Sequence, residues 1–146
     1  PYLCAATARA ISEISGGRLV LGIGISHRQL LSTLGIDMGD GREALRRYVD
    51  YVQRALAGTV ARGLLNTPPP PFPVPVYVAG NTVESAAVAG AVGDGLMPYL
   101  TPRSHLAVLL TAAADAARAA GRTAAVPCCL SIPTFVSEDV EAARSA

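Results

Sequence analysis

The stretch that most constrains the fold is RLVLGIGISH, residues 18–27. Three apolar residues (19–21) follow one another there, without the polar alternation that a half-exposed antiparallel strand would show. A continuous apolar run is typical of a strand buried on both faces, as in a parallel sheet covered by helices. Gly22 and Gly24 then leave the backbone bare where the strand ends. This stretch therefore predicts an α/β fold built on a parallel sheet.

Polar side chains follow this strand immediately. Ser26, His27 and Arg28 stand at its carboxyl end, which is where parallel α/β folds bind their ligands. Histidine is the side chain that gains and loses a proton near neutral pH, so His27 is the candidate for proton transfer. The second histidine, His105, falls in the first turns of a later helix, where a surface or packing role is the default interpretation.

The rest of the chain repeats this alternation of strands and helices. Apolar runs predict parallel strands over residues 18–24, 75–79, 96–100 and 127–135. Helical spacing of apolar residues predicts helices over 2–15, 40–58, 81–92, 101–121 and from 137 onward, with a loop or short helix at 28–38. Strict alternation implies βα units with right-handed crossovers. Four such strands make an open sheet or half of an eight-stranded barrel.

Capping residues mark the starts of the helices. Asp40, with Glu43 three positions later, predicts the start of the long second helix. Asn81, with Glu84 three positions later, predicts the start of the next one in the same way. Thr101, followed by a proline at the first helical position, predicts a third helix start.

A proline-rich segment, residues 67–75, separates the long second helix from the next strand. Consecutive prolines lack backbone donors and favour extended geometry, which favours a stiff connector over a ligand for a proline-binding partner. The units on either side of this connector are of the same kind. We therefore expect a single domain over residues 1–146.

Charge and cysteine content disfavour several classes of function. A net charge of +1, with five Tyr, two Phe and no Trp, provides neither the field nor the stacking surface for nucleic acid. No apolar run reaches the roughly 18 residues of a membrane-spanning helix, so we expect no membrane partner. Three cysteines, two of them adjacent and none in a C-x-x-C motif, favour free thiols in a reducing cytoplasm over a metal or redox site.

Two glycine-containing turns are candidate binding motifs. Gly22 and Gly24 lack the third glycine of a dinucleotide fingerprint, and no helix begins there, which disfavours a Rossmann site. The turn AGNT, residues 79–82, is the stronger candidate. A strand that opens through glycine into a helix N-terminus offers N–H groups and the positive end of the helix dipole, which suit a phosphate. The alternative is an ordinary strand-to-helix turn with an asparagine cap.

Four blocks of sequence, taken in order, resemble one protein superfamily. They are GRLVLGIGISHR, RRYVDYVQRALAG, PVYVAGNTVESAAVAGAVGDGLMPYL and TFVSEDVEAAR. Their order is similar to that of the bacterial luciferase-like monooxygenases, and most similar to the branch of coenzyme F420-dependent oxidoreductases. The resemblance implies an α/β fold of the (β/α)8 TIM-barrel family. This chain would contain about half of such a barrel, with four βα units and parallel strands.

The resemblance also implies a cofactor site. It assigns the phosphate of the cofactor to the turn formed by Ala79, Gly80, Asn81 and Thr82. It also places Gly95 and Leu96, from the next loop, close to this phosphate. It assigns the ring and the substrate to Ser26 and His27, with His27 as the catalytic candidate, and Gly24 beside them is a further cofactor-binding candidate. The implied chemistry is hydride transfer between coenzyme F420 and a small organic substrate, without a metal.

Other functions stay open at this point. Reduced FMN with oxygen as co-substrate would use the same phosphate site in place of F420. A catalytically inactive half barrel, acting as an assembly partner, would keep only the fold. A four-stranded half barrel would have two edge strands with unpaired backbone groups. These edges predict an incomplete chain, a homo-oligomer or pairing with a missing half.

Overall fold

The computed structural model describes residues 1–60 and 68–145 and contains the predicted alternation of helices and strands. The elements are α1 (Tyr2–Ser15), β1 (Leu21–Ile23), α2 (Arg28–Thr33), α3 (Gly41–Leu56), β2 (Val76–Ala79), α4 (Val83–Val92), β3 (Gly95–Met97), α5 (Arg103–Ala119) and α6 (Val140–Ser145). Residues 68–75 of the predicted connector contain no helix or strand, and its first residue, 67, lies outside the described residues. Among the described residues, no helix is long and apolar enough to cross a membrane.

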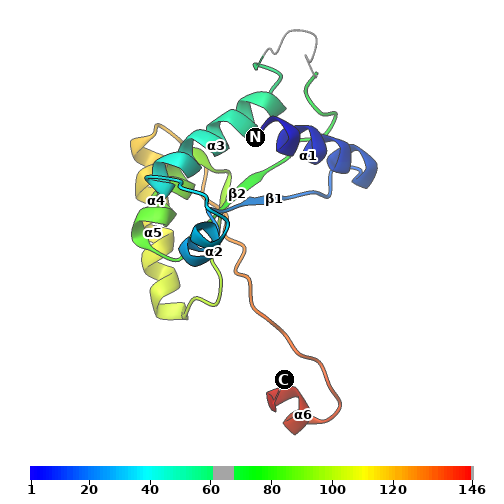
Figure 1. The fold of residues 1–146 in the computed structure, drawn as a ribbon, viewed down its shortest axis with the longest axis vertical. Coiled ribbons are helices and arrows are strands. Elements are labelled where there is room, and N and C mark those ends of the chain that lie inside the picture. Colours follow the sequence, from blue (N-terminus) through cyan, green and yellow to red (C-terminus); the bar gives the residue numbers. More distant parts are fainter. Residues whose placement is uncertain (61–67, 146) are drawn as a thin grey trace.

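The sheet is parallel and runs in the order β1-β2-β3. Figure 1 shows β1 and β2 side by side at its centre. Ile23 of β1 pairs with Val78 of β2, which pairs in turn with Leu96 of β3. The strands therefore follow their order in the sequence, as successive βα units require. This arrangement confirms the predicted α/β fold with parallel strands.

The predicted fourth strand pairs with β3 only by isolated bridges. Leu96 bridges to Cys128 and Tyr99 bridges to Ser131, both in the parallel sense and both with an offset of 32 residues. In a regular parallel ladder of this register, residue 98 would donate the hydrogen bond between these bridges. Residue 98 is a proline and has no N–H group. The segment is thus aligned as predicted, and the proline interrupts its ladder.

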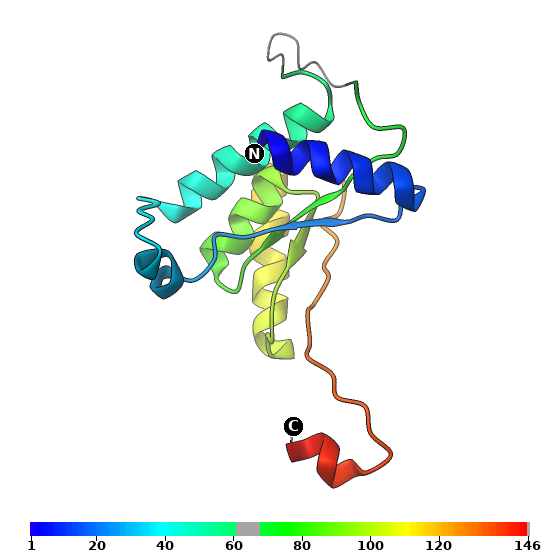
Figure 2. The ribbon, with the colours of Figure 1, turned by 45° about the vertical axis from the view of Figure 1, so that its right-hand side comes forward.

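One face of the sheet is covered by helices. Val76, Val78 and Leu96 are fully buried on this face and belong to one core with residues of α1, α3, α4 and α5. Figures 1 and 2 show these four helices gathered against the sheet, whereas α6 lies far from it at the end of an extended tail. The core therefore lies between a single helix layer and the sheet.

The opposite face of the sheet is open. The prediction that the first strand is buried on both faces is wrong, because Val20 is 51% exposed and Gly22 is exposed. β1 is an edge strand, and among the described residues no helix covers this side of it. On this face, the absence of a side chain at Gly95 leaves space for the ring of Tyr77 on the neighbouring strand.

The predicted cap of α3 is confirmed. Asp40 Oδ1 accepts hydrogen bonds from the backbone N–H groups of Arg42, at 3.0 Å, and Glu43, at 3.4 Å. The apolar stripe of the helix faces the core, with Val49 and Val52 fully buried. This capped, amphipathic helix follows directly from its sequence.

Helices α4 and α5 pack closely because α4 presents a glycine to its neighbour. Gly90 is buried, and a Cβ atom at this position would overlap the backbone carbonyl of Ala113 in α5. Backbone cannot move aside as a flexible side chain would. Gly90 therefore sets the distance between the two helices.

We expect Gly90→Ala to destabilise the protein, although alanine favours helix by about 1 kcal/mol over glycine. Overpacking against backbone should dominate and lower the free energy of unfolding by roughly 1–3 kcal/mol, measured by urea denaturation. Ala87→Gly in the same helix is the matched control and should show only the propensity cost of about 1 kcal/mol. A Gly90→Ala protein as stable as the wild type would contradict this packing.

Hydrogen bonds of Asp94 link the amino ends of β2 and β3. Its Oδ2 atom accepts hydrogen bonds from the Val76 N–H at 2.9 Å and from Gln53 Nε2 at 3.3 Å. Its own N–H donates to the Val76 carbonyl at 2.7 Å. Arg122 lies 3.5 Å from Oδ1 and also donates to the carbonyl of Gly93.

We predict that Asp94→Ala lowers the free energy of unfolding by about 1–3 kcal/mol, since it leaves the part-buried Val76 N–H without its carboxylate acceptor. Asp115→Ala is the control, because its exposed ion pair with Arg118 lies within one helix and should be worth under about 1 kcal/mol. Equal losses in the two variants, compared by thermal and urea unfolding, would show that Asp94 is an ordinary surface residue.

Candidate functional site

The carboxyl ends of the three parallel strands meet at one edge of the sheet, where most of the predicted site residues lie. β1 leads to Gly24, Ser26 and His27, and β2 leads into the turn 79–82. A Cβ atom on Gly24 would lie 3.1 Å from the Cβ atom of Ala79, so these two loops are in contact. The register alone brings these segments together, although more than fifty residues separate them in the sequence.

Two predicted residues are not brought to this edge. Leu96 is fully buried on the helix-covered face, and Gly95 is level with Tyr77 at the start of β3. Met97, rather than either of them, is level with Ala79 at the end of β2. The predicted approach of Gly95 and Leu96 to the turn is therefore not found, because they are the first two residues of β3 and lie before its carboxyl end.

The N-terminus of α4 is capped by Thr82 and not, as predicted, by Asn81. Thr82 Oγ1 accepts from the Ser85 N–H at 3.2 Å, and Ser85 Oγ accepts from the Thr82 N–H at 3.0 Å. This reciprocal pair forms the capping box that the sequence had assigned to Asn81 and Glu84. Serine replaces the usual glutamate, which explains why the pattern was read one residue too early.

Glu84 shows that the first turn of α4 favours negative charge. Hydrogen bonds from its own backbone N–H, and then from Thr82, lower the pKa of this exposed carboxyl group, and Arg42 adds a smaller effect. The Arg42 guanidinium lies 3.9 Å from the carboxylate. The pKa of Glu84 is thus lowered in the direction that the helix dipole predicts for a carboxylate in the first turn.

Gly80 is required by the turn itself. A Cβ atom at this position would lie 2.5 Å from Ser85 Oγ and 2.7 Å from Ser85 Cβ. A side chain there would break the capping box whether or not a ligand approaches. A substitution at Gly80 would therefore perturb the fold of the turn itself.

Asn81 joins the β2–α4 turn to the loop after β3. Its Nδ2 donates to the Tyr99 carbonyl at 2.7 Å, and its Oδ1 accepts from the Tyr99 N–H at 2.8 Å. His105 Nε2 lies 3.1 Å from the Asn81 carbonyl oxygen. His105 had been assigned a surface or packing role. Its position in the first turn of the helix after β3 was the signal that could have placed it at this edge.

Backbone strain marks the same edge. Among the described residues, the non-glycine residues with positive φ are Ser26, at 64°, and Leu100, at 49°. Each follows the carboxyl end of a strand. Such conformations are unfavourable for residues with a side chain and gather at functional sites. This strain supports a binding role for the loops after β1 and β3.

His27 is exposed and occupies the N-cap position of α2, with an extended backbone and no side-chain cap hydrogen bond. No hydrogen bond to its ring is found among the described residues. Its imidazole is therefore available to a ligand at the end of β1. Groups of three or more His, Cys, Asp or Glu able to hold a metal ion are not found in the described part of the chain.

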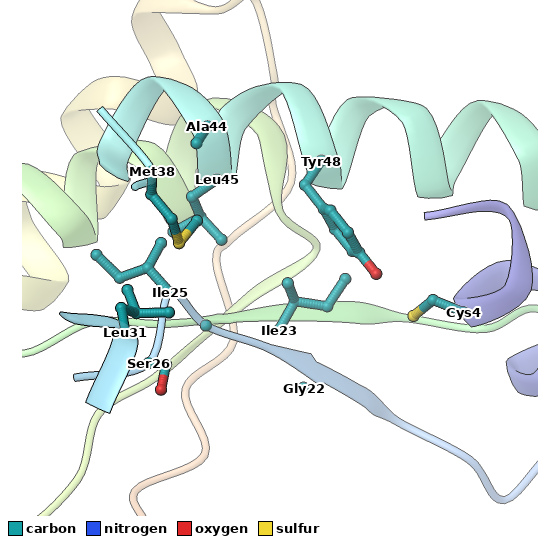
Figure 3. A pocket seen from close by; sticks show the side chains of 11 residues that line it. Cys4, Gly22, Ile23, Ile25, Ser26, Leu31, Met38, Ala44, Leu45 and Tyr48 are labelled. Carbon is teal, nitrogen blue, oxygen red and sulfur yellow. The ribbon is translucent and has the colours of Figure 1, made fainter. Parts of the chain in front are cut away.

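A pocket of about 460 Å³ adjoins the end of β1 (Figure 3). Apolar side chains from β1, α2, α3 and the loops between them form most of its wall, and Gly24 and Ser26 belong to its lining. The Tyr48 hydroxyl points toward Cys4 in Figure 3. Burial, together with a hydrogen bond to Cys4, raises the pKa of Tyr48. The sequence did not predict this pocket, because α1, β1 and α3 contribute to it together.

Fold and site together define an α/β protein of the barrel type, with its candidate site at the carboxyl ends of the strands. The sequence matches the luciferase-like monooxygenase family over residues 1–146. The chain therefore belongs to this family, which is a family of enzymes. The resemblance drawn from its sequence blocks is thus confirmed.

Two curated relatives are F420-dependent or related enzymes. The chain is 30% identical to the F420-dependent glucose-6-phosphate dehydrogenase of Beutenbergia cavernae over 159 aligned positions, which cover 99% of this chain and 47% of the relative. It is 26% identical to the 5,10-methylenetetrahydromethanopterin reductase of Archaeoglobus fulgidus, over 66% of this chain and 32% of the relative. The chain thus spans half or less of the length of these relatives.

Solved structures show the same fold. The coenzyme F420-dependent tetrahydromethanopterin reductase of Methanopyrus kandleri superimposes with a TM-score of 0.75 at 17% identity, covering 98% of this chain and 49% of that one. An F420-dependent secondary alcohol dehydrogenase, in complex with an F420–acetone adduct, gives 0.75 at 20% identity, covering 97% and 48%. EDTA monooxygenase from Chelativorans sp. BNC1 gives 0.70 at 20% identity, covering 99% and 44%. The chain therefore has the fold of part of these barrels.

We predict that Thr82→Ala lowers the free energy of unfolding by about 0.5–2 kcal/mol, because it removes the hydroxyl that accepts from the Ser85 N–H. Thr82→Ser keeps a hydroxyl at the same place and should stay within a few tenths of a kcal/mol of the wild type. Urea denaturation of both variants measures the difference. If both variants lost the same stability, the hydroxyl would not be the cap.

Proposed function

We propose that the chain carries the phosphate-binding end of a coenzyme F420 site and belongs to an oxidoreductase that acts on a small organic substrate. The observation that carries this proposal is the position of the α4 N-terminus, directly after the carboxyl end of β2 and beside the loop that follows β1. The F420 dependence of the curated relative from Beutenbergia cavernae supports this choice of cofactor. The residues that we propose for the phosphate are those of the turn 79–82.

The donors of this turn fit a phosphate group. Thr82 and Ser85 use their N–H groups on each other in the capping box, so a phosphate would bind the other N–H groups of this exposed helix end. The side chain of Asn81 is committed to Tyr99, so Asn81 would contribute its backbone and not its amide. Arg42 offsets the charge of Glu84 beside the turn. Binding of an anion here therefore requires no rearrangement of the sheet.

The remaining proposed roles concern the end of β1. When bound, F420 would supply the ring that carries the hydride. Gly24 and Ser26 would line the space for the ring, and the apolar pocket beside them would exclude water from an organic substrate. His27 is the residue that we propose for proton transfer, since its ring is exposed and free of protein partners among the described residues.

The domain and its association are proposals as well. The shared core of α1, α3, α4 and α5 supports a single domain over residues 1–146. The outer edge of β1 is unpaired among the described residues, and such an edge favours pairing with another strand. We therefore propose association with a second copy or with the other half of a barrel. A cytoplasmic location remains a prediction, supported by three free thiols.

Titration of the purified chain with F420, FMN and inorganic phosphate tests the cofactor proposal. We expect F420 to bind more tightly than FMN, and phosphate to compete with it. Glu84→Gln should strengthen F420 binding about two- to fivefold, because a nearby like charge costs on the order of 1 kcal/mol at an exposed site. Glu141→Gln, in the distant α6, is the matched control and should leave the affinity unchanged.

The outcomes separate the alternatives. Tighter binding of FMN than of F420 would show that the cofactor of this site is a flavin. Glu84→Gln without effect on a cofactor that does bind would show that the phosphate lies elsewhere. No binding of either cofactor by the folded chain would contradict the proposal and leave the inactive half barrel.

A further inference from the structure

The side chain of Asn81 acts as a bridge between two loops. Its amide donates to the Tyr99 carbonyl at 2.7 Å and accepts from the Tyr99 N–H at 2.8 Å. A backbone residue in a sheet makes the same pair of bonds with a neighbouring strand. Asn81 therefore continues the link between β2 and β3 beyond the point where both strands end.

His105 extends this bridge to the start of α5. Its Nε2 atom lies 3.1 Å from the Asn81 carbonyl oxygen. A carbonyl oxygen can only accept, so the hydrogen bond requires the proton of His105 to be on Nε2. The first turn of α5 is thereby joined to the turn that precedes α4.

The loop held by this bridge has a strained backbone. Leu100 adopts a positive φ of 49° immediately after Tyr99. Its N–H donates to the Ser131 carbonyl at 3.0 Å, and Thr101 Oγ1 donates to the Tyr99 carbonyl at 3.3 Å. A left-handed leucine persists only where the surroundings hold it. Asn81 supplies two of the hydrogen bonds that do so.

We propose that Asn81 and His105 are positioning residues for the cofactor site. They hold the loop 99–101 and the start of α5 against the turn 79–82, and so fix the shape of the phosphate-binding end. The inference rests on the proposed function for its consequence in binding, but the bridge itself is a property of the chain alone. Neither side chain needs to touch the cofactor.

Four variants of the 146-residue chain test the proposal, with Ser104→Ala as a matched control on the neighbouring exposed position. Asn81→Ala removes both hydrogen bonds to Tyr99, and Asn81→Asp keeps the shape but replaces the donor by a second acceptor. His105→Ala removes the link to α5, whereas His105→Gln retains a donor near the position of Nε2. Thermal unfolding is measured first, so that affinities are compared per folded molecule.

Hydrogen exchange of the Tyr99 and Leu100 amides, followed by NMR without cofactor, tests the bridge. We expect exchange to speed up by about tenfold or more in both Asn81 variants and by less in His105→Ala. His105→Gln and Ser104→Ala should resemble the wild type. Unchanged exchange at Tyr99 in folded Asn81→Ala would overturn the bridge.

Titration with F420 and FMN tests the positioning role. We expect binding to weaken by about tenfold in Asn81→Ala and His105→Ala and to recover in His105→Gln. Wild-type affinity in both alanine variants would overturn the proposal, even if their stability fell. If the wild type bound neither cofactor, the proposed function would fail, and the exchange measurements would still decide whether Asn81 and His105 hold the loop.

Discussion

The parallel pairing of β2 with a strand on each side is the constraint on which the rest of the structure depends. Parallel neighbours require a crossover between successive strands, and the helices of these crossovers lie on one face of the sheet. That face buries Val76, Val78 and Leu96 completely. The same pairing brings the loops after all three strands to one edge. The core and the candidate site therefore both result from the parallel pairing of the strands.

The open face of the sheet is shaped by glycine. Gly95 leaves room for the ring of Tyr77, and Gly22 leaves room for the end of the Met97 side chain. Large side chains therefore lie across neighbouring strands and fill part of the space above them. In a barrel of this family, that face is the interior, and the pattern of small and large residues fits such packing. The unpaired edge of β1 borders it directly.

At the candidate site, the side chains of Asn81, Thr82 and Ser85 are hydrogen-bonded within the chain. The hydroxyl groups of Thr82 and Ser85 each accept from the other residue's N–H group. Asn81 binds both the N–H and the carbonyl of Tyr99. These hydrogen bonds hold the turn in its conformation by contacts within the chain itself. The turn also requires glycine at position 80, because a side chain there would overlap Ser85.

The sequence by itself determined the α/β alternation, the cap at Asp40 and the family, because these depend on local periodicity and on motifs read in order. It placed the cap of α4 one residue early, since Asn81 and Thr82 are both good capping residues and only the fold shows which side chain is free. Tertiary structure alone decided that Asn81 binds Tyr99, that His105 reaches Asn81 and that Leu96 faces the core. These contacts depend on the strand register, which joins residues distant in the chain and leaves no local pattern.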